Sequence, residues 1–353
     1  MRWNMDPVIF PIGEIELRYY GLCFAIGLLL CAWMGPKYFE RWGLPRQHAE
    51  SLTLWVPVGM LLGAHYIHLI FYETEGLFDF RFEIESFWPP RATLGRFWAL
   101  GSGLASHGGG LGCVLSLLLF WHLRGKPLGL RFHRYADATM VASIWVYPWV
   151  RIGNFFNSEI LGRPTDMPWG VVFERWGDTV PRHPVVLYEA AMYFAELGFA
   201  LWMQKRYARK LRPGAMFYLL LMTHFTLRFI AEFFKDSQHV DEGWTLNMGH
   251  WLSLPIMLVC AFMIFGTKRF NILTPLTQAE EDEIEASVRT SARETVRLDA
   301  IAEANAKKED PAKAVEAALD KLDAEAAQRE EDSSDAPAKR KKKSGAKRKK
   351  PKS

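Results

Sequence analysis

The sequence predicts an all-α membrane protein with seven transmembrane helices, a polar cavity that opens to the outer face, and a charged C-terminal tail. Long apolar stretches, which hold most of the 24 Phe and 14 Trp, recur along residues 1–272. Residues 273–353 are instead charged, rich in Ala and nearly free of large apolar side chains. Basic residues also gather after every second apolar stretch, as in multi-pass membrane proteins. We therefore expect a membrane domain over 1–272 and a largely disordered or partly helical tail over 273–353.

The candidate spans are apolar segments near the roughly 17–25 residues that a transmembrane helix needs. The fourth of them is the shortest. No basic n-region or small-residue cleavage site precedes the first, so we expect it to be an uncleaved span. The segments are about 18–35, 51–72, 104–123, 135–150, 184–204, 214–234 and 249–267.

The orientation of the spans follows from the basic residues in the short loops. Lys and Arg follow the first, third, fifth and seventh spans, and such loops lie on the cytoplasmic side. The N-terminus is then expected outside the cytoplasm and the C-terminus inside it. The basic residues are Lys37, Arg41 and Arg46, then Arg124, Lys126, Arg131 and Arg134, then Lys205, Arg206, Arg209, Lys210 and Arg212, and finally Lys268 and Arg269.

Polar side chains gather at one predicted depth, at the outer ends of the spans. Ionisable residues at such depth are costly and usually line a cavity or a pathway. Arg151 and Arg228 come from different spans, and arginine can donate two parallel hydrogen bonds to a phosphate. An ion pair between Arg228 and Glu232 within one helix is the alternative for that pair. The whole set is Tyr20, His107, Arg151, Asn154, His183, Tyr188, Glu189, Arg228 and Glu232.

The motif "SHGGGLG" places His107 directly before Gly108 and Gly109 at an expected helix start. Glycines allow a ligand to approach the backbone, and free N–H groups at a helix start suit an anion. Close packing between helices explains the same glycines. His107 is accordingly either a base, because imidazole titrates near neutral pH, or a structural residue.

A second motif, "RIGNFFNSEILGR", fills residues 151–163 directly after the fourth apolar segment. The glycines indicate a shaped turn rather than a continued helix. Asn154 and Asn157 would hold either the backbone of that turn or a hydroxyl group of a ligand.

The remaining His and Cys residues predict no metal site. His65 and His68 lie three residues apart in one span, but no cluster of Cys or carboxylates lies at matching depth to complete a set of ligands. The four Cys lie inside apolar runs without metal-like spacing, so we expect them to be small buried side chains.

Six segments occur in an order and spacing that resemble the bacterial prolipoprotein diacylglyceryl transferases, over about residues 5–265. The resemblance implies an inner-membrane enzyme with seven spans, its site toward the periplasm, and neither a metal nor an organic cofactor. It implies transfer of a diacylglyceryl group from phosphatidylglycerol to the lipobox cysteine of a prolipoprotein, with release of glycerol phosphate. The segments are "DPVIFPIG…YYGL", "SHGGGLG", "RIGNFFNSEILGR", "RHPVVLYE", "LRFIAEFF" and "NMGHWLSLP".

The resemblance also implies roles for individual residues. Arg151 and Arg228 would hold the lipid phosphate, and His107 would be the base or would orient the headgroup. Tyr20 and Glu232 join these as catalytic candidates. The candidates for substrate binding are Arg151, Asn154, Asn157, Glu159, Gly162, Gly108, Gly109, His224 and Asp137.

The chain departs from the family pattern at several positions. His65 replaces a usual Arg, Val150 a usual Gly, and His250 a common Gln. His224 stands one helical turn before Arg228, where a Tyr is usual. His224 would serve as a hydrogen-bond partner or as an alternative base, so the base is either His107 or His224.

Two further expectations concern the tail and a competing function. The terminal run "KRKKKSGAKRKKPKS" would attract anionic lipid headgroups at about 1 kcal/mol per basic residue. We expect membrane lipids and no nucleic acid among the partners. A lipid-binding or transport protein with the same cavity is the alternative function, but it would spread its charges across the bilayer or contain repeats.

Overall fold

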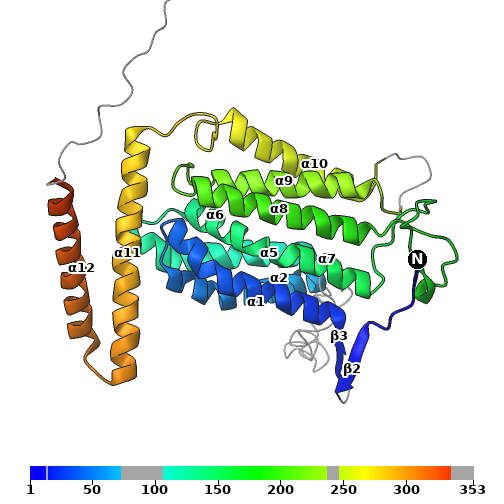
Figure 1. The fold of residues 1–353 in the computed structure, drawn as a ribbon, viewed down its shortest axis with the longest axis horizontal. Helices are drawn as coiled ribbons and strands as arrows, with labels where there is room; N and C mark the ends of the chain where they lie inside the picture. The colour runs from blue at the N-terminus through cyan, green and yellow to red at the C-terminus, as the bar shows by residue number, and fades with distance from the viewer. Residues whose placement is uncertain (13–14, 73–105, 237–245, 335–353) are drawn as a thin grey trace, which may run out of the picture. The chain divides into compact units, whose positions relative to one another are not determined.

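The computed structural model describes residues 1–12, 15–72, 106–236 and 246–334, and they are mainly helical. Several helices lie lengthwise beside one another in a bundle (Figure 1). They are α1 (Tyr19–Arg41), α2 (Arg46–Tyr72), α5 (Ser106–Phe120), α6 (Phe132–Ser143), α7 (Val146–Phe156), α8 (Val185–Tyr207), α9 (Ala215–Glu232) and α10 (Met248–Ala261). The last turns after α5 and α10 are π-helical, over Trp121–Gly125 and Phe262–Gly266.

The strands are short and lie outside the helices. A parallel pair joins β1 (Arg2–Trp3) to β4 (Val172–Phe173), and an antiparallel pair joins β2 (Val8–Ile12) to β3 (Ile15–Arg18). The hairpin of β2 and β3 leads directly into α1. These strands bring the N-terminal segment against the loop between α7 and α8, where the amino group of Met1 donates to the carbonyl of Gly170 at 2.8 Å.

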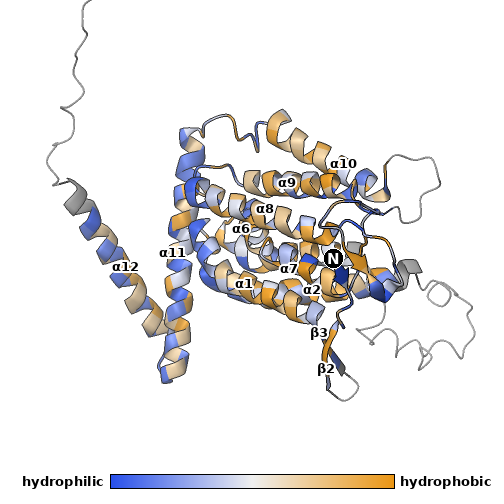
Figure 2. Cartoon of the chain, turned by 45° about the vertical axis from the view of Figure 1, so that its right-hand side comes forward, coloured by the Kyte–Doolittle hydropathy of each residue, from blue (hydrophilic) through white to orange (hydrophobic). Residues whose placement is uncertain are grey.

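The bundle has the surface of a membrane protein. Within the described residues, four helical stretches are long and apolar enough to cross a bilayer, namely α1, α8, α9 and Met248–Gly266. Apolar residues make up much of the bundle helices (Figure 2), and many large ones are exposed, which is unfavourable for a monomer in water. The exposed large side chains include Leu29, Trp33, Leu54, Leu119, Trp202, Leu258 and Phe262. The prediction of an all-α membrane protein is confirmed at this level.

The fourth expected span differs from the prediction because it is divided. Residues 135–150 fall into α6 and α7, which meet at a turn over Ile144 and Trp145. Pro148 explains the break, since it has no N–H to donate to the carbonyl of Ile144, four residues earlier. As a result α7 is separate from α6 and ends on Phe156. It includes the first half of the polar motif, residues 151–156, where the sequence predicted a turn, and the turn begins only at Asn157.

Helices α2 and α5 touch through their backbones. A Cβ atom added to Gly63 would overlap the carbonyl oxygen of Gly108, and one added to Gly112 would overlap that of Gly59. This glycine contact is the close packing that the sequence left as an alternative for "SHGGGLG". The backbone of Gly108 therefore faces α2 rather than an open space.

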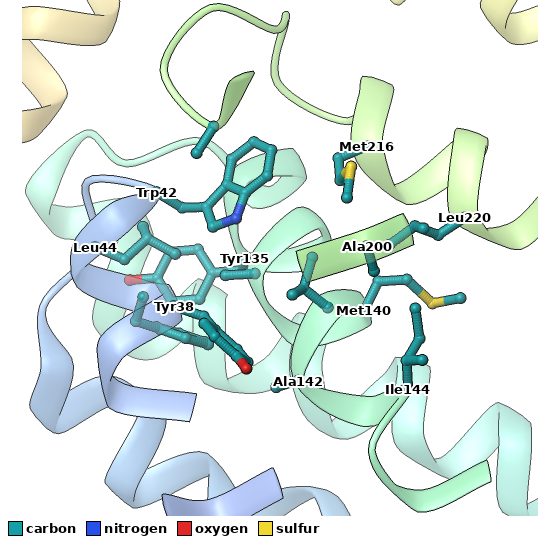
Figure 3. Close-up of a cluster of buried hydrophobic side chains, with 14 of the residues drawn as sticks. Tyr38, Trp42, Leu44, Tyr135, Met140, Ala142, Ile144, Ala200, Met216 and Leu220 are labelled. Carbon is teal, nitrogen blue, oxygen red and sulfur yellow. The ribbon is translucent and has the colours of Figure 1, made fainter. Parts of the chain in front are cut away.

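The main core lies where α1, α6, α8 and α9 meet. Tyr38, Trp42, Tyr135 and Met216 are among its largest buried side chains (Figure 3). The indole of Trp145 donates to the Tyr38 hydroxyl at 2.9 Å, so polar atoms in this apolar core are also paired. This core holds the helices together at the end where α1 finishes and α9 begins.

The C-terminal part continues as α11 (Gln278–Lys307) and α12 (Pro311–Ser334), so residues 278–334 are helical apart from a short break. The chain divides into two compact units, Met1–Ala292 and Arg293–Ser353. The first unit extends past residue 272 because Arg212 holds Glu280 of α11. Inside the second unit, Arg293 pairs with Asp323 of α12 at 2.8 Å. The basic terminal run lies outside the described residues.

Candidate functional site

The carboxylate of Glu159 stabilises the turn that follows α7. Glu159 accepts hydrogen bonds from the side-chain amides of Asn154 at 2.7 Å and Asn157 at 3.0 Å. Its own N–H donates to the carbonyl of Asn154 at 3.0 Å. Ser158 and Ile160 take the left-handed conformation, with φ of 56° each, which side chains rarely adopt. The two asparagines thus hold a strained turn through Glu159.

Gly162 brings this turn to the end of α9. A Cβ atom at Gly162 would overlap the carbonyl oxygen of His183 and lie 2.7 Å from Val185, so only glycine fits. The next residue, Arg163, donates its N–H to the carbonyl of Phe234 at 2.9 Å and its Nε to that of Lys235 at 3.0 Å. The loop after α7 is therefore attached to the residues that follow α9.

A buried chain of charges joins α7, α8 and the end of α9. The guanidinium of Arg151 lies 3.0 Å from one oxygen of Glu189, and the ammonium of Lys235 lies 2.9 Å from the other. Lys235 also pairs with Glu232 at 3.0 Å. The side chain of Glu189 is 0% exposed, so both cations depend on it for their charge balance. Arg151 donates in addition to Asn154 at 3.3 Å, which connects the charges to the turn.

Arg228 of α9 differs from Arg151 in its ion-pair contacts. Glu232 pairs with Lys235, and within the described part of the chain Arg228 has no ion-pair partner. The alternative of an Arg228–Glu232 ion pair is therefore not what the structure forms. Arg151 lies over the ring of Tyr193 at 5.9 Å. Arg228 lies on α9, one helical turn before Glu232.

His224 forms a second buried pair, deeper in the bundle than Arg228. Its Nδ1 lies 3.0 Å from a carboxylate oxygen of Glu196, whose side chain is 0% exposed. The imidazole lies between the rings of Tyr193 and Tyr147, each with its centroid 4.6 Å away. This packing fixes the ring plane and leaves Nε2 as the ring atom that is not bound to Glu196.

The first turn of α10 closes the site on the far side of α9. Asn247 and His250 cap that helix, since the Asn247 N–H donates to Nδ1 of His250 at 3.0 Å. A Cβ atom at Gly249 would overlap the carboxylate of Glu232, so the backbone of α10 lies directly against that group. The positive end of the helix dipole is therefore next to Glu232.

The structure brings together most of the residues that the sequence singled out. Tyr20 at the start of α1 packs against Gly153 of α7, 3.0 Å from the position of an added Cβ atom. Gly109 lies in van der Waals reach of α2, where Met60 would be 3.4 Å from an added Cβ atom. The side chain of His107 lies outside the described residues, so its role stays a prediction.

Asp137 lies elsewhere. Its two oxygens accept the backbone N–H groups of Gly214 and Phe217 at 2.7 and 2.8 Å, at the first turn of α9. Glu232 is about 27 Å further along the same helix at 1.5 Å per residue. A fully buried carboxylate that satisfies a helix N-terminus has a structural role, and the structure does not place it with Arg151.

Sequence reasoning missed Lys235 and Glu196. Glu196 is an acid inside the apolar stretch "AAMYFAELGFALW", two turns after Glu189, and that isolation was the available signal. Lys235 follows Glu232 by three residues on the outer side, where the topology needs no cation. Its partner Glu189 comes from another helix, so only the fold reveals the pairing.

These features define a class, a multi-pass helical membrane protein with a buried charged site at one end of its bundle. Residues 7–266 match the family described as prolipoprotein diacylglyceryl transferase. The chain belongs to this family and is a transferase. The match ends before α11, so the tail is additional to the family region.

Curated relatives agree with the family match along most of their length. A phosphatidylglycerol–prolipoprotein diacylglyceryl transferase of Tolumonas auensis is 38% identical over 257 residues, which cover 72% of this chain and 93% of the relative. One of Bacteroides fragilis is 34% identical over 280 residues, covering 77% and 97%. One of Chloroherpeton thalassium is 33% identical over 268 residues, covering 74% and 92%.

Proposed function

We propose that this chain transfers the sn-1,2-diacylglyceryl group of phosphatidylglycerol to the lipobox cysteine of prolipoproteins, with glycerol 1-phosphate as the second product. The single observation that carries the proposal beyond the family match is the buried charge network, which Arg151 joins from α7 and which includes Glu232, one turn after Arg228 on α9. Two guanidinium groups from different helices suit a phosphate at this point. The named relatives act on the same two substrates.

The charge balance of the buried group supports a phosphodiester as its ligand. Arg151 pairs with Glu189, and Lys235 pairs with both Glu189 and Glu232, which leaves Arg228 without an ion-pair partner among the described residues. Phosphatidylglycerol carries one negative charge on its phosphate. We assign Arg228 as the primary phosphate ligand, because Arg151 is already committed in part to Glu189.

The reaction requires a base and a group that stabilises the leaving phosphate. A cysteine thiol has a pKa of about 8.5, so it must lose its proton before attack. The thiolate then forms a C–S bond to the glycerol carbon that carries the phosphate, the C–O bond breaks, and its electron pair moves to the phosphate oxygen. Arg151 and Arg228 would hold the additional negative charge on that oxygen.

We infer that His224 can act as the base, and its contact with Glu196 supports this role. A proton on Nδ1 satisfies Glu196 at 3.0 Å and leaves the lone pair of Nε2 to accept the thiol proton. Glu196 would then orient the ring and stabilise the imidazolium, as carboxylates do in hydrolase triads. His107 is the competing base, and one substitution at each position separates the two.

The same proposal includes the finer topology. The positions of α1, α2, α5, the α6–α7 pair, α8, α9 and α10 suit seven spans, with the charged site in a cavity toward the periplasm of a bacterial inner membrane. The N-terminus would be periplasmic and the C-terminus cytoplasmic, because the basic loops that follow α1, α5 and α8 lie at the opposite end from Arg151. Residues 1–272 would form the transferase domain and 273–353 a cytoplasmic tail.

The test is a transfer assay with the full chain. Purified protein in detergent is incubated with phosphatidylglycerol and a lipobox peptide, and the peptide mass is followed. We expect a gain of one diacylglyceryl group on the cysteine, with Arg151→Ala and Arg228→Ala each slower by about 10²–10³-fold. Arg206→Ala is the matched control, an exposed arginine at the other end of α8 that should transfer normally.

Two comparisons separate the bases and the alternative function. A His107→Gln variant with normal transfer would remove His107 as the base, and the same result for His224→Gln would remove His224. Phosphatidylglycerol that binds at the arginines without any transfer would instead favour the lipid-binding or transport function.

A further inference from the structure

A second charged pocket lies at the end of the bundle opposite to Arg151. Its volume is about 290 Å³. The bundle contributes Arg131, Arg134, Arg212 and Arg269, and the first half of α11 contributes Glu280 and Ser287. All of these residues belong to the compact unit Met1–Ala292. Because the family match ends at residue 266, one wall of this pocket comes from a segment that the family region lacks.

The α11 wall is attached by strong contacts. Arg212 is buried and donates to the carboxylate of Glu280 at 2.7 and 3.0 Å, while it also holds the carbonyls of Asn271 and Thr274. The hydrogen bonds from Arg212 lower the pKa of Glu280 to about 2. Arg131 forms a further ion pair with Glu283. The pocket is therefore part of the folded structure and not a gap beside a loose helix.

Two buried donor groups in this pocket have no partner within the described residues. Arg134 is 2% exposed; its Nη1 donates to the carbonyl of Ala208 at 2.9 Å, but its Nη2 donates to nothing. The hydroxyl of Ser287 on α11 is buried without a hydrogen bond as well. Arginine can only donate, so the partner that Nη2 lacks must be an acceptor. An unpaired buried donor is costly, which points to a ligand that supplies the acceptor.

The charges around the pocket indicate an anion. Four arginines line it, against the carboxylates of Glu280 and Glu283. Asp137 lies near Arg134 in the sequence, and its oxygens already accept two backbone N–H groups of α9. Counting Asp137, one positive charge remains in excess. Arg269 contacts the ring of Phe270, and no carboxylate among the described residues forms an ion pair with it.

We propose that this pocket binds a phosphate group, held by Arg134 and Ser287. Its volume lies just below the roughly 300–1,000 Å³ of small-molecule sites, which suits a phosphate ester with a small substituent. Such a group comes either from free phosphate compounds or from the headgroup of an anionic lipid. The inference is independent of the transfer reaction, because it uses residues about 27 Å from the end of α9 that carries Glu232.

The first arm of the test measures binding of inorganic phosphate to the full chain in neutral detergent by calorimetry. We expect Ser287→Ala to weaken binding by about tenfold, the usual effect of one lost hydrogen bond to a charged group. Arg134→Lys keeps the charge but loses the paired donors, so it should weaken binding further. The matched controls are Ser51→Ala, whose exposed hydroxyl already donates to Gln47, and Arg206→Gln.

The second arm distinguishes the source of the phosphate. Protein in nanodiscs of phosphatidylcholine is compared with protein in nanodiscs that contain phosphatidylglycerol. A lipid headgroup in the pocket would abolish phosphate binding in the second case only, whereas a site for free phosphate would bind equally in both.

Ser287→Ala removes one hydroxyl from a partly exposed helix, so the variant should fold, and its melting temperature verifies this. Phosphate binding that is absent from the wild-type chain in both detergent and phosphatidylcholine discs would overturn the proposal. Equal binding by the wild type, Ser287→Ala and Arg134→Lys would also overturn it.

Discussion

Glu189 is the residue on which the buried charges depend, and Glu189→Gln tests this directly. The substitution keeps the shape of the side chain but removes the negative charge between Arg151 at 3.0 Å and Lys235 at 2.9 Å. Breaking a buried ion pair by removing one partner costs about 3–5 kcal/mol. Lys235 keeps Glu232, and Arg151 retains some contact with solvent, so we expect the lower end, about 3 kcal/mol.

The free energy of unfolding is measured by denaturant titration in mixed micelles. Glu50→Gln, an exposed glutamate of α2, is the control and should change it by less than about 0.5 kcal/mol. The rate at which a thiol reagent modifies the buried Cys23, which packs near Gly153 of α7, reports whether α7 loosens locally when the Arg151–Glu189 ion pair is lost.

A double variant then separates the loss of the Glu189–Lys235 ion pair from a general loss of stability. If Glu189 balances Lys235, Lys235→Met should cost less in the Glu189→Gln background than in the wild type, by at least about 1 kcal/mol. A Glu189→Gln protein as stable as the Glu50→Gln control would refute the account of the charge network.

Three further predictions concern the base, the helix contact and the tail. Glu196→Gln should slow transfer by about 10²–10³-fold with little change in the melting temperature, if His224 is the base; unchanged transfer would exclude that role. Gly112→Ala should destabilise the bundle by about 1–3 kcal/mol, because its methyl group would overlap the carbonyl of Gly59; an unchanged melting temperature would contradict the backbone contact between α2 and α5. Because the folded pKa of Glu280 is about 2, below its ordinary value, its attachment of α11 should be complete above about pH 4.5 and lost as the pH falls toward 2. Protection from hydrogen exchange at the start of α11, corrected for the intrinsic pH dependence of amide exchange, should follow this change in the wild type and vary less over that range in Glu280→Gln.

Some features followed from the sequence because they depend on local patterns. The length and polarity of each apolar segment determine whether a helix can lie in a bilayer, and Lys and Arg in the loops determine its direction. An ionisable residue is costly deep in a membrane, so the sequence alone indicates that Arg151, Glu189 and Glu232 are unusual. The folded chain brings these three residues to one place. The shaped turn around Gly162 was likewise visible as a motif.

The pairings did not follow from the sequence, because each joins residues that only packing brings together. Arg228 and Glu232 are four residues apart and would suit an ion pair, yet Lys235 takes Glu232 and is itself held by Glu189 of α8. Asp137 resembled a site residue in type, but the position of α9 made it a cap for Gly214.

The tail shows the same division most clearly. Its composition predicted that the tail would form no core of its own and that it could form helix. Tertiary structure decided that Arg212 would hold Glu280 and so bring Ser287 to the pocket of Arg134, more than a hundred residues away in the chain. Helix formation depends on neighbouring residues, whereas a binding pocket depends on distances between segments, and those distances exist only after the chain has folded.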